Sequence, residues 1–213
     1  MTTHAAVAVR RVADVLDTTP PSPDWMSPCE QQRAARLRAP ARHAQYCAGH
    51  WLLRQLLARA FGGDPTDYPL IERENLPPAV AGSNLCVSLS HGGDWIAAAW
   101  SSAAIGVDIE ARESRPALGR LQQLLLNPDE PLDSLDDDAL LQRWVLKEAV
   151  IKRDHGIALP EQLAALQLQP TRGGRADVEL LSSDDWHLAV TLAGILVDTE
   201  MTIRSSSRWV LCA

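Results

Sequence analysis

The sequence predicts a mixed α/β (α+β) protein of two similar lobes, each a small and mostly antiparallel sheet with one packed helix. In each half, a helical pattern precedes short strands, at 41–60 and at 139–154. An Asp-Trp pair then opens a small-residue apolar strand in both halves, "DWIAAAW" and "DWHLAVT". A chain of 213 residues can form two half-size lobes that bury a core. We place the lobes at 1–103 and 104–213.

Composition excludes several classes of protein. With 27 acidic and 20 basic residues the formal net charge is −7, which disfavours nucleic-acid binding and electrostatic membrane attachment. The four cysteines are far apart, so neither a zinc cluster nor a disulfide framework is indicated. We expect no signal peptide and no membrane span, and therefore a soluble, cytoplasmic protein.

The first helical pattern covers residues 28–61, and Gly62 and Gly63 end it. One face of that pattern carries Leu52, Leu53, Leu56, Leu57 and Ala60. The following stretch, 65–82, holds four prolines. It is predicted to be a loop-rich arm across the surface that adds little to the core.

Three strands are predicted next, at 86–89, 95–100 and 104–110. "SHGGD" joins the first two, and we expect all three to form one meander. In the second half, the acidic run 136–138 supplies a cap for the helix 139–154. Trp95, like its counterpart in the second half, is interpreted as a core residue.

"GVDIE" places two carboxylates one residue apart in an apolar strand. Residues i and i+2 of a strand share a face, with Cα atoms about 7 Å apart, so Asp108 and Glu110 converge. Two like charges at this distance raise each other's pKa or need a cation between them, and magnesium suits hard oxygen ligands. The alternative is a strand end where both groups are hydrated.

"WVLKEAVIK" places Trp144, Glu148 and Lys152 on one face of the second helix. The tryptophan indicates that this face lines a cleft. The alternative is a solvated Glu-Lys pair.

"SLSHGG" offers a hydroxyl at Ser90, an imidazole at His91 and accessible backbone amides, which together can bind phosphate. A histidine with only a structural role is the alternative. The sequence contains no G-x-S-x-G elbow, which speaks against a serine hydrolase. A basic group that could also bind phosphate, or simply flank a solvated helix, comprises Arg33, Arg36, Arg38 and Arg42.

Taken in order, "SLSHGGDW", "IGVDIE" and "WVLKEAVIK" resemble the three signature motifs of the 4'-phosphopantetheinyl transferases of the Sfp type, in the branch with W-x-x-K-E-A. The resemblance covers roughly residues 30–195 and implies two pseudo-symmetric lobes with the active site between them. It further implies transfer of the 4'-phosphopantetheine arm of coenzyme A to a serine of an acyl or peptidyl carrier protein.

The same resemblance assigns roles to residues. Asp108, Glu110 and Glu148 would hold magnesium, or manganese in its place. Asp108, Glu148 and Lys152 would be the catalytic residues, with Glu148 as the base and Lys152 on the pyrophosphate. Helix geometry gives Lys147 a lesser role, either structural or adjacent to the site, because neighbouring helix positions cannot share one face.

Coenzyme A would be bound by Lys152 and by the residues of the first lobe Arg38, Arg42, Ser90 and His91. The sequence departs from the family pattern in this region, because His43, Gln45 and His50 stand where relatives have arginine. "NLPP" at 75–78 likewise replaces the usual Gly-Lys-Pro.

The expected partner is a carrier protein of fatty-acid, polyketide or nonribosomal-peptide synthesis, bound by a monomer. Our candidate docking segment is 112–135, with the basic and apolar residues Arg112, Arg115, Arg120, Leu121, Leu124 and Leu125. Two alternatives stay open: a metal-dependent phosphohydrolase with water as nucleophile, and a non-catalytic protein that binds coenzyme A or a carrier.

Overall fold

The computed structural model describes residues 4–113, 122–130, 135–154, 160–173, 176–192 and 197–212. The mixed α+β fold is confirmed. In the first half the elements are β1 (Ala5–Arg11), α1 (Val12–Asp17), η1 (Pro23–Trp25), α2 (Pro28–Ala34), α3 (Pro40–Phe61), η2 (Pro65–Asp67), β2 (Leu70–Arg73), β3 (Leu76–Val80), β4 (Cys86–Gly92) and β5 (Trp95–Ser101). In the second they are β6 (Val107–Ala111), α4 (Gln122–Leu125), α5 (Asp137–Arg153), α6 (Pro160–Ala165), β7 (Leu168–Thr171), β8 (Val178–Ser182), β9 (Trp186–Val190), β10 (Val197–Thr199) and β11 (Ser205–Leu211).

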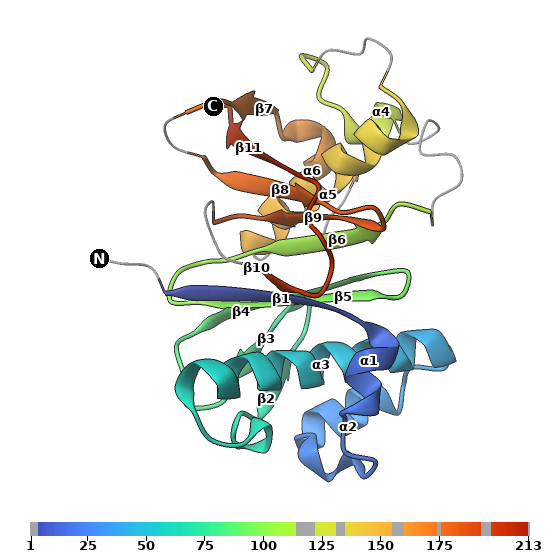
Figure 1. Ribbon diagram of the computed structural model, residues 1–213, viewed down its shortest axis with the longest axis vertical. Coiled ribbons are helices and arrows are strands. Elements are labelled where there is room, and N and C mark those ends of the chain that lie inside the picture. Colours follow the sequence, from blue (N-terminus) through green and yellow to red (C-terminus); the bar gives the residue numbers. More distant parts are fainter. Residues whose placement is uncertain are drawn as a thin grey trace.

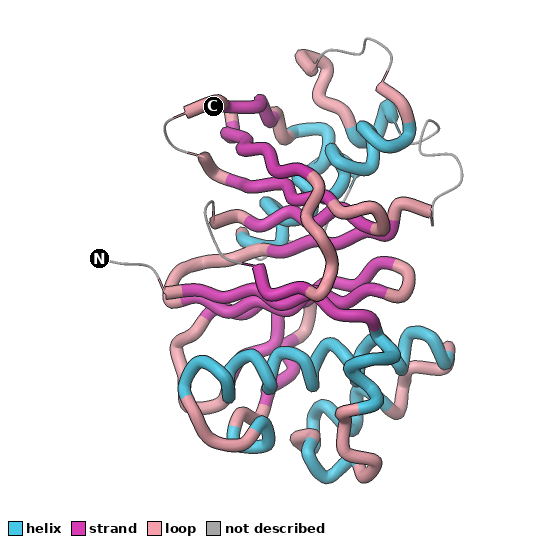
Figure 2. The backbone as a smooth tube through the Cα atoms, in the orientation of Figure 1, coloured by secondary structure: helices cyan, strands magenta, loops and turns pink. Residues whose placement is uncertain are grey.

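Two sheets form the centre of the molecule, with strand orders β10-β1-β5-β4 and β6-β9-β8-β11-β7 (Figures 1 and 2). Helix α3 packs against β5, and α5 packs against β6 and β9. Apolar side chains from β1 and β5 meet those from β6 and β9 in one buried cluster. Trp95 and Trp186, the tryptophans of the two similar strands, are 5% and 0% exposed, and their ring centroids lie 6.3 Å apart. Both are core residues, as predicted.

The predicted three-strand meander is wrong at its third strand. β6 pairs antiparallel with β9 and lies at the edge of the second sheet. The β4 strand meets β6 through side chains: the hydroxyls of Ser88 and Ser90 accept hydrogen bonds from the backbone N–H groups of Val107 and Ile109, at 3.0 and 3.3 Å. Sequence adjacency favoured pairing with β5, but the apolar faces of β6 and β9 are buried together between the sheets.

The two halves are also joined by β10, which comes from the second half and pairs in parallel with β1. Asp198 in β10 forms ion pairs with Arg10 at 2.9 Å and Arg59 at 2.6 Å. The lobe boundary between residues 103 and 104 stays a prediction.

The helical pattern over 28–61 forms two helices instead of one. Pro40 begins α3, because proline suits a first helical turn and disfavours a helical residue before it. α3 ends as predicted, at Gly62, whose φ of 86° few other residues adopt. α2 begins with a capping box in which Ser27 and Glu30 bond each other's backbone N–H groups.

The prediction that the loop-rich arm 65–82 adds little to the core is wrong. The segment contains the hairpin β2-β3, and Leu70 and Val80 are 0% and 5% exposed in the core. Prolines 77 and 78 are tolerated because β3 pairs with β2 alone and needs few backbone donors. Asn75, with φ of 56°, supports the turn.

α5 agrees with the sequence prediction, and the side chain of Asp136 caps it by accepting from Ala139 N at 2.8 Å. Lys147 on this helix is 0% exposed and binds Glu130 at 2.7 Å and the carbonyl oxygen of Leu125 at 2.8 Å. Its role is therefore structural. Among the described residues, no helix is both long and apolar enough to cross a membrane.

Candidate active site

A cavity of about 1030 Å³ brings together residues of both halves of the chain. Its lining includes every residue that the motifs assigned to the site except Arg38: Arg42, Ser90, His91, Asp108, Glu110, Glu148 and Lys152. α3 and β4 contribute the first three, while β6 and α5 contribute the last four. Three motifs that are far apart in the sequence therefore share one cavity.

Asp108 lies at the centre of the charged end, with only 2% of its surface exposed. Its Oδ1 accepts hydrogen bonds from Lys152 Nζ at 2.6 Å and from Ser90 Oγ at 2.7 Å. Lys152 Nζ also donates to Ser90 Oγ at 3.0 Å and lies 3.8 Å from Glu148 Oε2. The lysine ammonium thus lies between two of the three predicted metal ligands.

The charge of Lys152 is set by opposing effects. Burial lowers its pKa, but Asp108, Glu148 and Glu110 together outweigh burial and leave the pKa above its ordinary value. Lys152 is therefore a permanent cation at neutral pH. It neutralises part of the negative charge that the three carboxylates bring to the cavity.

The carboxylate oxygens in the cavity are chemically suited to bind a hard divalent cation. Asp108 Oδ2 is buried, and no described residue bonds it, so this carboxylate oxygen has a free lone pair. Glu110 and Glu148 line the same cavity with oxygen donors of the type that magnesium prefers. Within the described ranges, no three His, Cys, Asp or Glu residues gather closely enough to hold a metal, so the ligand set stays a prediction.

Two glycines in the motifs allow the backbones to approach closely. A Cβ on Gly92 would lie 2.6 Å from the Cα of Glu110, and one on Gly106 would overlap the carbonyl oxygen of Ala149. β4 and α5 can contact the β6 segment this closely only because these positions lack side chains. Gly92 is therefore needed for β4 to pack closely against the backbone of Glu110.

His91 lies beside a basic side chain. Arg42 Nη1 is 2.7 Å from His91 Nε2. Burial, together with the positive charges of Arg42 and Lys152, lowers the pKa of His91 to about 4. His91 is therefore neutral at neutral pH, where it can share a hydrogen bond with a phosphate without repelling the arginine.

Arg38 differs from the other predicted site residues. It is exposed, and it is not among the residues that line the cavity. Of the basic group in this segment, Arg33 and Arg42 line it instead. Trp144 is also outside the lining; it packs between two apolar clusters around α5, so the stripe that it shares with Glu148 is only partly directed at the cavity.

Tyr46, His50 and the whole tip of the β2-β3 hairpin line the far part of the cavity. Sequence reasoning named His50 and 75–78 only as departures from the family pattern, and it missed Tyr46 and the hairpin. Arg73 lies in this hairpin next to 75–78, the segment that replaces the usual Gly-Lys-Pro, and so supplies a basic side chain there in addition to Arg33 and Arg42. Its Nε donates to Pro77 O at 2.7 Å. The hairpin was hidden by its prolines. The capping-box pattern Ser27-x-x-Glu30 could have predicted the start of α2, the helix that packs against β2 of the hairpin.

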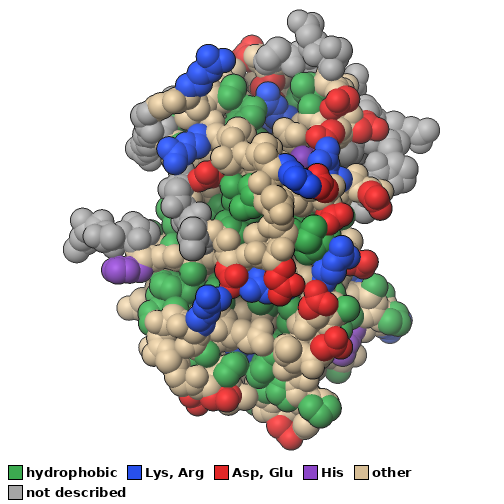
Figure 3. All heavy atoms as spheres, viewed as in Figure 1, with side chains coloured by type: hydrophobic (Ala, Val, Ile, Leu, Met, Phe, Trp, Pro, Cys, Tyr) green, Lys and Arg blue, Asp and Glu red, His purple; other side chains and the backbone are tan. Residues whose placement is uncertain are grey.

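The structure describes the predicted docking segment only in part. Three of its residues lie outside the described residues: Arg115, Arg120 and Leu121. Arg112 binds Asp138 at 2.9 Å. Leu124 is 48% exposed, but Leu125 is 0% exposed in an apolar cluster beneath α5 and α6, so the prediction is wrong for Leu125. On the face shown in Figure 3, basic and acidic side chains are intermixed, which agrees with weak long-range attraction for any partner there.

Comparison with known proteins gives concordant results. Residues 104–202 match the family model described as the 4'-phosphopantetheinyl transferase superfamily. A 4'-phosphopantetheinyl transferase of Bacillus subtilis is 28% identical over 140 residues, which are 62% of this chain and 61% of that protein. The 4'-phosphopantetheinyl transferase Sfp of Bacillus subtilis strain 168 is 24% identical over 167 residues, covering 75% of this chain and 73% of that protein. The chain thus spans less than two thirds of the length of the first relative. The resemblance to the Sfp type is confirmed.

Proposed function

Because this chain resembles the Sfp-type 4'-phosphopantetheinyl transferases, we propose that it transfers the 4'-phosphopantetheine arm of coenzyme A to a serine of an acyl or peptidyl carrier protein. The observation that carries the proposal is the single cavity in which Asp108, Glu110, Glu148 and Lys152 lie together with Ser90 and His91. Its volume of about 1030 Å³ is large enough for an extended nucleotide ligand.

The reaction forms one bond and breaks one. The serine oxygen of the carrier bonds to the β-phosphorus of coenzyme A, and the bond from that phosphorus to the bridging oxygen breaks. The serine proton goes to a base, and 3',5'-ADP leaves with the electron pair of the broken bond. Negative charge accumulates on the pyrophosphate, so the site must supply positive charge there.

Lys152 supplies that charge in our proposal. Its ammonium is fixed by Asp108 and Ser90 and stays protonated, so it can bind a pyrophosphate oxygen without reorganisation. Glu148, one turn earlier on α5, is the proposed base for the serine proton. Arg42 and His91 are the proposed contacts for a phosphate of the nucleotide.

Asp108, Glu110 and Glu148 are the proposed ligands of a magnesium ion, with manganese as a substitute. When bound, this ion neutralises charge on the pyrophosphate oxygens. The buried, unbonded Oδ2 of Asp108 supports this assignment.

We propose a monomeric, cytoplasmic enzyme without nucleic-acid or membrane partners, in which 1–103 contacts the nucleotide and 104–213 carries the metal ligands and catalytic residues. The net charge of −7 supports the exclusion of nucleic acid.

Mass spectrometry of carrier proteins tests the proposal. A panel of acyl and peptidyl carriers is incubated with coenzyme A and magnesium, with chelator and with the Glu148→Gln variant as controls. Gain of the pantetheine arm, dependent on the metal and on Glu148, is the expected result. Cleavage of coenzyme A without a carrier would instead favour the phosphohydrolase. Binding of coenzyme A that does not respond to magnesium, with every carrier unchanged, would favour the non-catalytic protein.

A further inference from the structure

The β2-β3 hairpin forms part of the cavity wall with seven consecutive residues, Glu72 to Pro78. The hairpin is a sheet of two strands, without a backbone ladder to either larger sheet. Its base is fixed by burial of Leu70, and Ser27 Oγ donates to Leu70 O at 2.6 Å. The position of its tip must therefore depend on side-chain contacts.

Glu72 makes the last of those contacts before the tip. Its Oε1 accepts a hydrogen bond from the hydroxyl of Tyr46 at 2.8 Å, and its backbone N–H donates to Cys29 Sγ at 3.4 Å. Beyond Glu72, the hydrogen bonds described for the hairpin are internal, such as the one from Arg73 to Pro77. Two contacts therefore hold the wall formed by residues 73–78: β3 packs beside β4, and on the β2 side the hydrogen bonds of Glu72 are the last ones to the rest of the protein before the tip.

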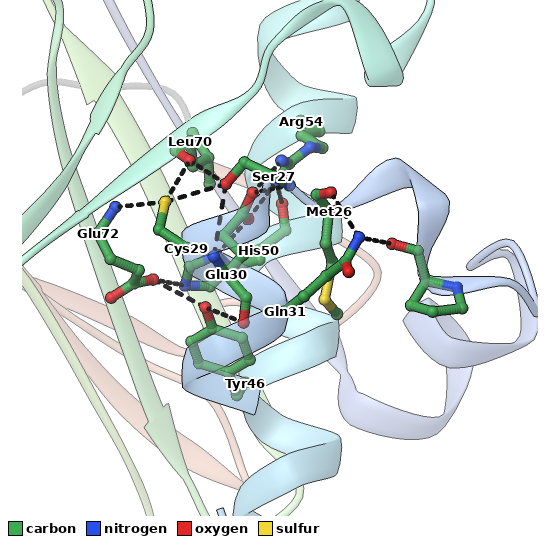
Figure 4. Close-up of polar contacts among 11 residues, drawn as sticks. Met26, Ser27, Cys29, Glu30, Gln31, Tyr46, His50, Arg54, Leu70 and Glu72 are labelled. Carbon is green, nitrogen blue, oxygen red and sulfur yellow. Dashed lines mark hydrogen bonds and ion pairs between the residues drawn. The ribbon is translucent and has the colours of Figure 1, made fainter. Parts of the chain in front are cut away.

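The groups that bind Glu72 are themselves held by a buried ion pair (Figure 4). His50 lies one turn after Tyr46 on α3, with ring centroids 4.1 Å apart, and its Nε2 is 3.4 Å from Glu72 Oε1. His50 Nδ1 is 2.8 Å from Glu30 Oε1. Both Glu30 oxygens also accept hydrogen bonds from Arg54, and Glu30 and Arg54 are each 0% exposed. This chain of contacts connects α2, α3 and the hairpin.

Both Glu30 and Tyr46 keep the protonation state that these contacts need at neutral pH. Burial alone would raise the pKa of Glu30, but hydrogen bonds from His50 and Arg54 hold it at about 2, so the carboxylate stays charged. Burial and the adjacent Glu72 raise the pKa of Tyr46 above its ordinary value, so its hydroxyl stays a donor. The Tyr46 to Glu72 hydrogen bond is thus available throughout the neutral range.

We propose that Tyr46 is a positioning residue: through Glu72 it fixes the hairpin wall of the cavity and so sets the affinity for coenzyme A without setting the rate of transfer. The choice of coenzyme A as ligand rests on the proposed function. The positioning of the hairpin does not, because it is a property of the free protein.

Hydrogen exchange on the free protein tests the positioning. In Tyr46→Phe and Glu72→Ala, the amides of residues 73–76 should exchange about tenfold faster, the effect expected for loss of one hydrogen bond to a charged group. Glu72→Gln keeps an acceptor and should stay near wild type. Tyr68→Phe is the matched control, because the Tyr68 hydroxyl donates to Gly62 O at 2.6 Å and does not line the cavity.

Calorimetric binding and steady-state kinetics then test the consequence. Tyr46→Phe should raise both Kd and KM for coenzyme A about tenfold and change kcat less than about twofold. Unchanged exchange at 73–76 in the folded Tyr46→Phe and Glu72→Ala variants would overturn the positioning role. Faster exchange with unchanged Kd would overturn the role in affinity. A wild-type protein that binds no coenzyme A would refute the proposed function and this choice of ligand, while the exchange result would still decide the positioning role.

Discussion

The two long helices of this protein, α3 and α5, are built alike and serve the cavity differently. Each packs against a central sheet and carries a fully buried basic residue paired with an earlier glutamate, Arg54 with Glu30 and Lys147 with Glu130. Towards the cavity, α3 presents Arg42, Tyr46 and His50, while α5 presents Glu148 and Lys152. In the proposed function, the first helix binds the ligand and the second carries the chemistry.

The two ion pairs also differ in the partners that complete them. Glu130 accepts further hydrogen bonds from the backbone N–H groups of Asn127 and Leu168. The Nε of Arg54 has no hydrogen-bond partner among the described residues. Arg54 bonds both oxygens of Glu30, and His50 adds a third contact. Lys147 bonds one oxygen of Glu130 and a backbone carbonyl, and burial leaves its pKa below the ordinary value although Glu130 opposes this shift. The planar guanidinium thus anchors the helix that must hold the cavity wall.

Removal of either buried cation should have the largest effect on stability. Arg54→Met and Lys147→Met each leave a buried glutamate unpaired, so each should lower the free energy of unfolding by about 3 to 5 kcal/mol. Urea denaturation measures this loss. Arg59→Met, at an ion pair whose arginine side chain is 74% exposed, should cost less than about 1 kcal/mol. A loss below about 1 kcal/mol at Arg54 or Lys147 would contradict the importance of these buried ion pairs for stability.

Glu148→Gln tests the chemical role of α5. Because Glu148 is both the proposed base and a proposed metal ligand, the measurement is made at saturating magnesium. There kcat should fall on the order of 10²-fold or more, KM for coenzyme A should change much less than kcat, and the free energy of unfolding should stay within about 1 kcal/mol of wild type. Steady-state kinetics with a carrier measures it. Glu161→Gln, exposed on α6, is the control. An equal loss in both variants, or a rise in KM alone, would contradict the assignment of chemistry to α5.

Acid should weaken the α3 ion pair. The pKa of Glu30 in the folded protein is about 2, below the ordinary value of 4.5, so its contribution is complete above about pH 4.5 and is lost as the pH falls towards 2. The loss should amount to about 3 kcal/mol. The free energy of unfolding, measured from pH 2 to 7 for wild type and Glu30→Gln, should show this slope only in the wild type. Parallel curves would rule it out.

Gly92→Ala tests the close approach of β4 to β6. The new Cβ would lie 2.6 Å from the backbone of Glu110, so we expect a loss of about 1 to 3 kcal/mol in the free energy of unfolding and reduced transfer activity. Gly173→Ala is the control, since a Cβ at that position would meet no atom within 4 Å beyond its chain neighbours. Thermal unfolding distinguishes the two. A fully stable and active Gly92→Ala variant would contradict the close approach.

Arg42→Gln should have the smallest effect and the opposite kinetic signature to Glu148→Gln. Loss of one charged phosphate contact should raise KM for coenzyme A about tenfold and leave kcat within about twofold. Arg36→Gln is the matched control, because Arg36 is exposed on the same segment but does not line the cavity. A fall in kcat without a change in KM would contradict the proposal that α3 binds the ligand while α5 carries the chemistry.

Local patterns and side-chain chemistry were enough to predict several features of the protein. These features are the mixed fold, the start and cap of α5, the end of α3 and the residues at the charged end of the cavity. Asp108 and Glu110 share a face because a strand alternates, and Glu148 and Lys152 do so because a helix repeats, whatever the rest of the chain does.

Strand pairing, the place of the hairpin and the choice of arginines at the cavity depend on long-range packing. β6 joins β9 instead of β5 because burial between the sheets outweighs proximity along the chain. β2 and β3 form despite their prolines because Leu70 and Val80 find a core to fill. These outcomes depend on contacts between residues distant in sequence, and no local pattern records the free energy of such contacts.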